Sequence, residues 1–191
     1  DNAGGFVING ITLGDQSGRS ISGAGDVNGD GLDDLIVGTY LADSNGESSG
    51  ASYVVFGKKD GTAVELSDIQ QDSAEDGFVI NGGAEGDQSG MSVSSAGDVN
   101  GDGLDDLIVG AFTGSPNGLV SGASFVVFGK TDGTALELSD IESGAGGFVI
   151  NGVARFDYSG FSVSSAGDVN GDGFDDLIIG ARGDDPNGES S

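Results

Sequence analysis

Three acidic loops contain the residues whose types and spacing could do chemistry. The loops span residues 26–34, 98–106 and 168–176, and each places Asp or Asn at positions one, three, five and nine and glycine at position six. Calcium takes six to eight oxygen ligands at about 2.3–2.6 Å, and a sharply turning loop supplies several of them at once. The sequence therefore predicts three calcium (Ca2+) sites, one in each loop.

Each predicted site uses four side chains and the backbone carbonyl of the seventh loop residue. The ligands are Asp26, Asn28, Asp30, Asp34 and the Leu32 carbonyl in the first loop, Asp98, Asn100, Asp102, Asp106 and the Leu104 carbonyl in the second, and Asp168, Asn170, Asp172, Asp176 and the Phe174 carbonyl in the third. Magnesium suits the loops less well because it prefers six near-octahedral ligands and keeps its waters. The other interpretation is a solvated acidic turn, which three copies at identical spacing disfavour.

Two further positions in the loops carry expectations. At position eight, Asp33, Asp105 and Asp175 are expected to be solvated charges that need not reach the ion. An EF-hand would need Glu at position 12, but Val or Ile stands there, inside an apolar run. We therefore expect each loop to join two strands and not two helices.

The elements that must position the loops recur along the chain. The segment Gly-Phe-Val-Ile-Asn-Gly at 5–10 returns at 77–82 and 147–152, which divides the chain into two complete units, 1–76 and 77–146, and a partial unit, 147–191. The units contain short runs rich in Val, Ile and Phe, bounded by Gly, Asn, Asp and Ser, and such runs are typical of strands. Helical periodicity is limited to about one turn in each complete unit, near residues 66–69 and 138–141.

Four short strands at a fixed period predict an all-β fold of β-propeller blades. Each blade would be a four-stranded antiparallel sheet, which must stack on neighbours because it cannot bury both faces alone. The chain would supply two complete blades and one partial blade with an unpaired edge, whereas closed propellers have about four to eight blades. We therefore expect either self-association or neighbouring blades from a longer chain.

The composition excludes several classes of function. The 191 residues include 32 acidic and 6 basic side chains, and the formal charge of −26 makes nucleic acid and anionic membranes poor partners. Cysteine and histidine are absent, which excludes disulfides, thiol chemistry and the usual general base. No run approaches the roughly 20 apolar residues that cross a bilayer, so we expect no membrane insertion.

Short motifs elsewhere are interpreted as incidental. Arg182-Gly183-Asp184 matches an integrin-recognition tripeptide, but the equivalent segments 40–42 and 112–114 have other residues. Residues 46–50 match the nucleophile-elbow pattern Gly-x-Ser-x-Gly, yet no histidine exists to activate Ser48 and the second unit has Val120 there. Paired carboxylates can hydrolyse glycosides, but acids that recur with the repeat fit a metal role better. We predict no enzymatic activity.

The chain resembles the FG-GAP repeats of integrin α-subunit propellers and of many bacterial surface proteins. The matching features are the Asp-x-Asn-x-Asp-Gly-x-x-Asp loops and the Val-Val-Phe-Gly and Phe-Val-Ile-Asn-Gly strands, and the similarity covers essentially the whole chain. The resemblance implies blades whose first strand, such as 89–96, lines the propeller axis, with calcium bound in the loop to the second strand. The units are somewhat longer than those of the best-known members.

These features together predict a calcium-stabilised structural or adhesive module, extracellular or at the cell surface. Extracellular modules bind calcium at about 10⁻⁴–10⁻³ M, so cytosolic calcium would leave such sites largely empty. The residues leave one alternative open, in which the chain is a carbohydrate- or protein-ligand-binding propeller domain attached to a secreted enzyme. In that case its partner would be a surface glycan or a protein ligand.

Overall fold

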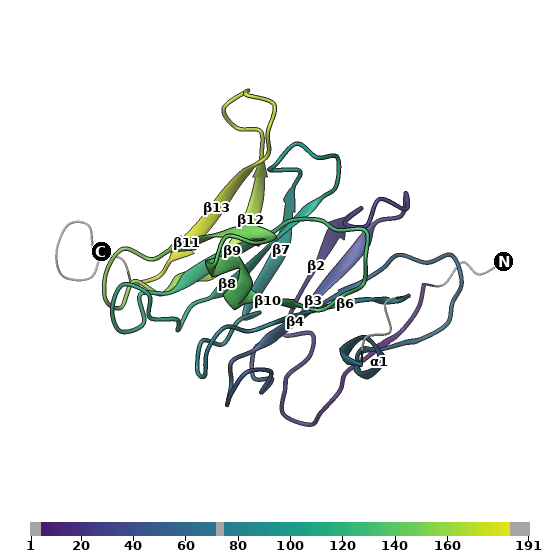
Figure 1. The fold of residues 1–191 in the computed structure, drawn as a ribbon, viewed down its shortest axis with the longest axis horizontal. Helices are drawn as coiled ribbons and strands as arrows, with labels where there is room; N and C mark the ends of the chain where they lie inside the picture. Colours follow the sequence, from purple (N-terminus) through teal and green to yellow (C-terminus); the bar gives the residue numbers. More distant parts are fainter. Residues whose placement is uncertain (1–4, 72–74, 184–191) are drawn as a thin grey trace.

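The chain is mostly β. The computed structural model describes residues 5–71 and 75–183 (Figure 1). The strands are β1 (Ile8–Asn9), β2 (Ser20–Gly25), β3 (Asp34–Thr39), β4 (Ala51–Val55), β5 (Val64–Glu65), β6 (Gly77–Asn81), β7 (Ser92–Gly97), β8 (Asp106–Ala111), β9 (Ala123–Val127), β10 (Leu136–Glu137), β11 (Gly147–Asn151), β12 (Ser159–Gly167) and β13 (Asp176–Ala181). The helices are α1 (Leu66–Gln70) and α2 (Leu138–Glu142), which confirms the single helical turns that the sequence indicates.

The strands form small antiparallel sheets. In the first sheet β2, β3, β4 and β6 are antiparallel neighbours in that order, and the short β10 adds to the outer edge of β6 in a parallel sense. The second sheet has the order β7, β8, β9 and β11, and the third sheet consists of β12 and β13. β1 pairs with β5 in parallel. Each Val- and Ile-rich run is therefore a strand that pairs within a sheet, and β3, β4, β8 and β9 have partners on both sides.

The outer strand of each four-stranded meander comes from the following sequence unit. The second Phe-Val-Ile-Asn segment forms β6 and pairs with β4, and the third forms β11 and pairs with β9. Glu137, on β10, accepts a hydrogen bond from Asn81 of β6 (2.7 Å), and Glu65 accepts one from Asn9 in the same way (2.6 Å). The first strand of each sequence unit that begins at residue 77 or 147 thus completes the sheet of the preceding unit.

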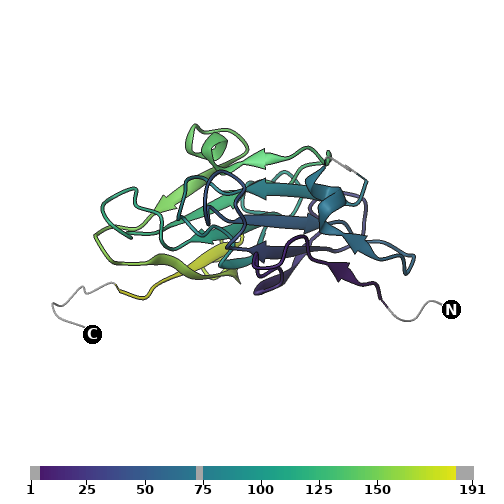
Figure 2. The ribbon, with the colours of Figure 1, turned by 90° about the horizontal axis from the view of Figure 1, so that it is seen from below.

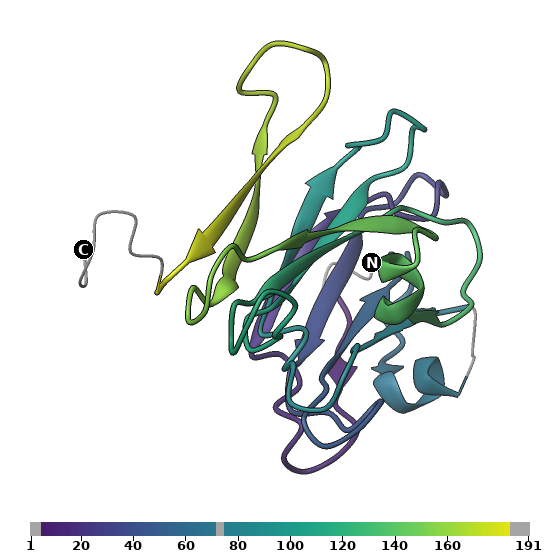
Figure 3. The ribbon, with the colours of Figure 1, turned by 60° about the vertical axis from the view of Figure 1, so that its left-hand side comes forward.

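The three sheets follow one another across the molecule, with their first strands adjacent (Figure 3). The Oγ of Ser20 on β2 accepts a hydrogen bond from the amide of Val93 on β7 (3.0 Å), and the Oγ of Ser92 donates to the carbonyl of Gly160 on β12 (2.8 Å). In Figure 2, β1 and β13 lie toward opposite sides of the molecule. No helix within residues 5–71 and 75–183 combines the length and apolar character of a membrane span.

The core lies between the sheets because strand side chains alternate between the two faces. Ile36 of β3 points toward the second sheet and is buried in one cluster with Val93, Leu107 and Val109. Ile108 of β8 points toward the third sheet, where Leu177 and Ile179 pack against its cluster. One apolar face of each sheet therefore covers the opposite face of the next.

Candidate functional site

The three acidic loops are the hairpin connections between the first two strands of the sheets. They join β2 to β3, β7 to β8 and β12 to β13, and each hairpin has a register shift where the loop begins. The expectation that each loop joins two strands is confirmed. The apolar run after each loop forms the second strand, whose pairing partners prevent it from becoming the exit helix of an EF-hand.

Each loop curls around the carboxylate of its first residue. In the first loop Asp26 Oδ1 accepts hydrogen bonds from the amides of Gly29 (2.8 Å) and Asp30 (3.0 Å), and Asp26 Oδ2 accepts one from Gly31 (2.9 Å). Asn28 Oδ1 accepts from the amide of Asp30 (2.8 Å), and Asp30 Oδ1 accepts from that of Leu32 (2.8 Å). The same bonds recur in the second and third loops. These local bonds are the turn chemistry that Asp and Asn provide.

The ninth residue of the first two loops is a buried carboxylate. Asp34 is 0% exposed, and its Oδ2 and Oδ1 accept hydrogen bonds from the amides of Val27 (2.9 Å) and Gly57 (2.7 Å). Asp106 is also 0% exposed and accepts from Val99 (3.0 Å) and Gly129 (2.9 Å). Each carboxylate thus ties its loop to the chain that follows the third strand of its own sheet.

Burial raises the pKa of both carboxyls. Desolvation lifts the pKa of Asp34 to about 6, against the effect of its two amide hydrogen bonds, and the negative charges of Asp30 and Asp26 add to the rise. Desolvation likewise lifts the pKa of Asp106 to about 6, with Asp102 and Asp98 as the neighbouring charges. Buried carboxylates beside like charges favour either a proton or a cation.

The donor set of each loop fits a hard cation. It contains carboxylate, amide and carbonyl oxygens, which are the ligands that calcium takes in proteins, and Asp34 lies buried near two further charges that a cation would offset. Within the residues that the structure describes, however, no three acidic side chains converge in the manner of a preformed metal cluster. The loops therefore bring the fifteen predicted ligands into three tight turns, and the coordination itself stays a prediction.

The expectation that the eighth residue is a solvated charge is wrong for Asp105. Asp105 Oδ2 accepts a hydrogen bond from the amide of Asp26 in the preceding loop (2.8 Å), and the amide of Asp105 donates to the Asp26 carbonyl (3.2 Å). The carboxylate of Asp175 lies against Gly97 at the start of the second loop, whereas Asp33 is exposed. Neighbouring sheets bring these residues together, and spacing within one loop could not reveal that.

A glycine precedes each loop, and the first two of these glycines make room for this contact. Gly25 and Gly97 have φ values of +73° and +70°, and a Cβ on either would overlap the carboxylate of Asp105 or Asp175. Gly167, before the third loop, has the same backbone conformation (φ +67°) but open space around it. The glycine is a signal in the sequence, although its purpose appears only when the next sheet is in place.

The incidental motifs gain no chemical role. Ser48 has a φ of +51°, but Val120, which replaces it in the second unit, has a φ of +54°, so the conformation belongs to the repeat and not to a nucleophile. The Arg182 guanidinium lies over the Phe161 ring, 4.6 Å from its centroid. Asp184, the last residue of the Arg-Gly-Asp tripeptide, lies outside the described residues.

Comparison with known protein families matches the segments that build these loops. The FG-GAP repeat family matches residues 17–55, 89–127 and 159–191. The chain belongs to the FG-GAP repeat family. The first two FG-GAP segments contain β2 to β4 and β7 to β9, the strands on either side of the acidic loop, and the third begins at β12. FG-GAP repeats often bind calcium, and they imply propeller blades.

The FG-GAP chain is also similar to integrin α subunits over most of its length. It is 30% identical over 185 residues to integrin alpha-PS2 of Drosophila melanogaster, 30% over 188 residues to integrin alpha-5 of Xenopus laevis and 35% over 182 residues to integrin alpha-PS5 of Drosophila melanogaster. These alignments cover 93–94% of this chain but only 12–16% of each relative. The similarity therefore concerns one part of the integrin chains.

We expect the calcium-free FG-GAP chain to lose stability as the pH rises from about 4 to about 6. The folded pKa of Asp34 and Asp106 is raised from 3.8 to about 6, so the folded state binds these protons more tightly than the unfolded state does. Their stabilising effect is complete below pH 3.8 and is lost as the pH passes the folded value. Urea unfolding in chelator across this pH range measures how steeply the free energy of unfolding falls with pH. The Asp34→Asn/Asp106→Asn double variant should reduce this slope. An unchanged slope would contradict the assignment to these two carboxyls.

Proposed function

We propose that this FG-GAP chain is an extracellular, calcium-stabilised structural or adhesive module and not an enzyme. The observation that carries the proposal is the recurrence of one oxygen-rich loop at the same hairpin of all three sheets, with Asp34 and Asp106 buried at its end. Repetition suits a stabilising ion at each sheet better than catalysis, which normally has a single site.

The sheets are proposed to be propeller blades, two complete and one partial. The first and second sheets each contain a four-stranded antiparallel meander, and β2, β7 and β12 lie next to one another as the innermost strands of a propeller do. Because closed propellers need about four to eight blades, the chain would either associate with itself or adjoin further blades of a longer polypeptide.

Calcium would act where negative charge is densest. When bound, it would supply positive charge to oxygens that otherwise repel one another, and three ions would reduce the formal charge from −26 to about −20. The chain's own residues do the rest: Asp26 orders the loop through three amides, and Asp34 ties the loop to Gly57 after β4. The proposed extracellular location would suit sites with the weak affinity of extracellular modules, about 10⁻⁴–10⁻³ M.

Calcium should raise the thermal stability of the chain, and a chelator should remove the increase. Binding to the folded loop alone contributes about 1.4 kcal/mol per site at tenfold excess over Kd. Differential scanning calorimetry in calcium, magnesium and chelator measures the effect. Asp30→Asn should reduce the calcium response, whereas Asp33→Asn, in the same loop but outside the predicted ligand set, should keep it. A melting temperature that calcium does not change would refute the proposal.

A further inference from the structure

The surface where the second and third sheets meet has an exposed group of aromatic and apolar side chains beside an arginine. Leu119 is 54% and Phe156 41% exposed, and Phe112 is half-buried. The half-buried Tyr158 ring stacks on Phe156 with 6.5 Å between centroids and on Phe112 with 6.4 Å. The Arg155 guanidinium lies over the Phe156 ring, 4.4 Å from its centroid. These five residues are called the aromatic patch below.

The junction between the first and second sheets has the same backbone contact but different side chains. There the amide of Gly86 donates to the carbonyl of Glu47 (3.0 Å), just as the amide of Phe156 donates to that of Leu119 (3.0 Å). The repeat aligns polar residues and glycine of the first junction with the patch: Glu47 with Leu119, Glu85 with Arg155, Gly86 with Phe156 and Gln88 with Tyr158. The fold therefore does not require the aromatic patch.

Phe156 has a backbone conformation that an aromatic residue rarely adopts. Its φ is +69°, whereas the first two units have glycine at this position, Gly14 (φ +114°) and Gly86 (φ +81°). The left-handed region is unfavourable for any side chain with a Cβ, so phenylalanine here lowers the stability of the fold relative to glycine. Strained residues cluster at functional sites, and the strained side chain here is also exposed.

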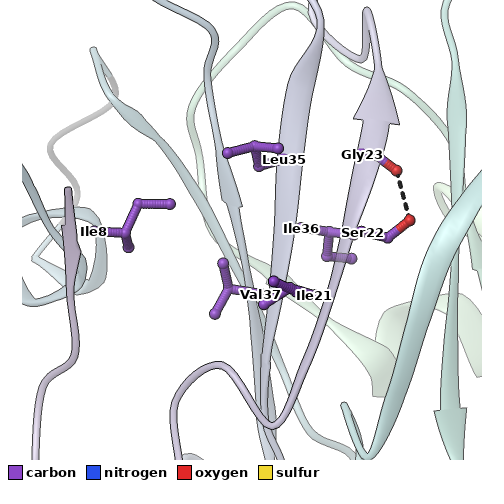
Figure 4. A pocket seen from close by; sticks show the side chains of 7 residues that line it. All are labelled: Ile8, Ile21, Ser22, Gly23, Leu35, Ile36 and Val37. Atoms are coloured by element: carbon purple, nitrogen blue, oxygen red, sulfur yellow. Dashed lines mark hydrogen bonds between the residues drawn. The ribbon is translucent and has the colours of Figure 1, made fainter. Parts of the chain in front are cut away.

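The aromatic patch lies where a following sheet does not cover it. At the first junction, which the third sheet follows, the equivalent Glu47, Glu85 and Gly86 are exposed as well. The cavity of about 330 Å³ on the first sheet, lined by Ile21 and Val37 among others, is of a different kind (Figure 4). The matching face of the second sheet is buried in the cluster that joins the first two sheets, so this cavity belongs to a packing face.

The chemistry of the aromatic patch fits a protein segment. Centres of protein interfaces are rich in aromatic residues and Arg and poor in Glu, and the exchange of Glu47 and Glu85 for Leu119 and Arg155 goes in that direction. Among the described residues, no carboxylate lies within ion-pair distance of Arg155, which leaves its guanidinium available to a carboxylate of the partner. Because the charge of −26 repels polyanions, a single carboxylate among apolar residues fits better than an acidic polysaccharide.

We propose that the aromatic patch binds a protein segment in which apolar side chains flank one Asp or Glu. Phe156 and Leu119 contact the apolar side chains of the partner. The Arg155 guanidinium, held over the Phe156 ring, donates hydrogen bonds to the carboxylate. The inference rests on the adhesive part of the proposed function, to which it gives a partner, and it involves none of the predicted calcium ligands.

Random peptides displayed on phage and selected on the full 191-residue chain in calcium test the proposal. The enriched sequences should combine apolar residues with an Asp or Glu. In fluorescence anisotropy, Phe156→Gly and Leu119→Glu should each weaken the binding of the enriched peptides at least about tenfold, the effect of losing an interface anchor. Replacing the peptide carboxylate with its amide should weaken binding to the unaltered chain but improve binding to Arg155→Glu, where the carboxylate would meet a like charge.

The repeat supplies variants that keep the fold. Each of the three substitutions introduces the residue of the first junction, so circular dichroism should show all three variants folded. Leu13→Glu, at a fully exposed apolar residue of the first unit, is the control and should bind the peptides like the unaltered chain.

Two results would overturn the proposal. One is a selection that enriches no peptide, or only peptides that bind Phe156→Gly as well as the unaltered chain. The other is binding to a glycan array that depends on Phe156, which would replace the protein segment by a carbohydrate. Calcium should raise the melting temperature of Phe156→Gly as it does that of the unaltered chain, so a failure of the patch is distinguishable from a failure of calcium stabilisation.

Discussion

Replacing Phe78 with alanine should lower the free energy of unfolding by about 3–5 kcal/mol, the usual cost of removing a buried phenylalanine. Phe78 lies on β6 and is 0% exposed. Its ring packs edge to face on Phe56, 6.1 Å between centroids, and the Lys130 ammonium lies 4.8 Å from its centroid. The substitution would open a cavity in the cluster that joins the first and second sheets.

Phe148 provides the matched control for this substitution. It occupies the same place on β11 and meets Phe128 with the same centroid distance, 6.1 Å, but it is 41% exposed. Phe148→Ala should therefore cost markedly less, about 1 kcal/mol. Urea unfolding followed by far-ultraviolet circular dichroism gives the free energy of unfolding of both variants. Equal losses in the two variants would show that burial between the sheets does not determine the cost of the substitution.

Replacing Gly25 with alanine should destabilise the chain by about 2–3 kcal/mol more than replacing Gly167. Both glycines have nearly the same positive φ, so the backbone strain of an alanine is common to the two variants. At Gly25 the new methyl group would also displace Asp105, and the amide of Asp26 would lose its partner. The difference between the two variants thus isolates the contact between the loops.

A double-mutant cycle identifies the displaced side chain. Asp105→Ala removes the carboxylate that the methyl group would overlap, so Gly25→Ala should cost less in that background than in the unaltered chain. Chemical denaturation of the four proteins gives the coupling energy. Strictly additive losses would mean that Asp105 is not what fills the space beside Gly25.

The elements of this fold were accessible from local sequence patterns. Apolar runs bounded by turn residues predict the strands, and the Asp, Asn and Gly spacing predicts the hairpin loops because their hydrogen bonds span only two to five residues. Two features depend on pairing between distant segments and could not be predicted from local sequence patterns. One is the origin of the outer strands β6 and β11 in the next sequence unit. The other is the contact from Asp105 to Asp26, between residues that lie 79 positions apart.

The candidate site, too, could be predicted only in part from the sequence. The sequence identifies which side chains carry oxygen donors, and the structure adds that Asp34 and Asp106 are fully buried with raised pKa values. Each buried carboxylate accepts a hydrogen bond from a glycine amide, Gly57 or Gly129, that follows β4 or β9 and lies 23 residues away in the sequence. The spacing of ligands within a loop contains no information about such an environment.

The sharing of the outer strand fixes where this protein can be divided. A fragment cut at residue 76 would leave β4 without β6, whereas one that extends through Asn81 keeps the four-stranded meander intact. The strand β6 pairs with the first sheet, but the chain continues from it into the second sheet. Because such a strand links two sheets, adjacent sheets should unfold together as one cooperative unit. Gene fusions and excised modules made from this chain would therefore need boundaries in the stretch between β6 and β7.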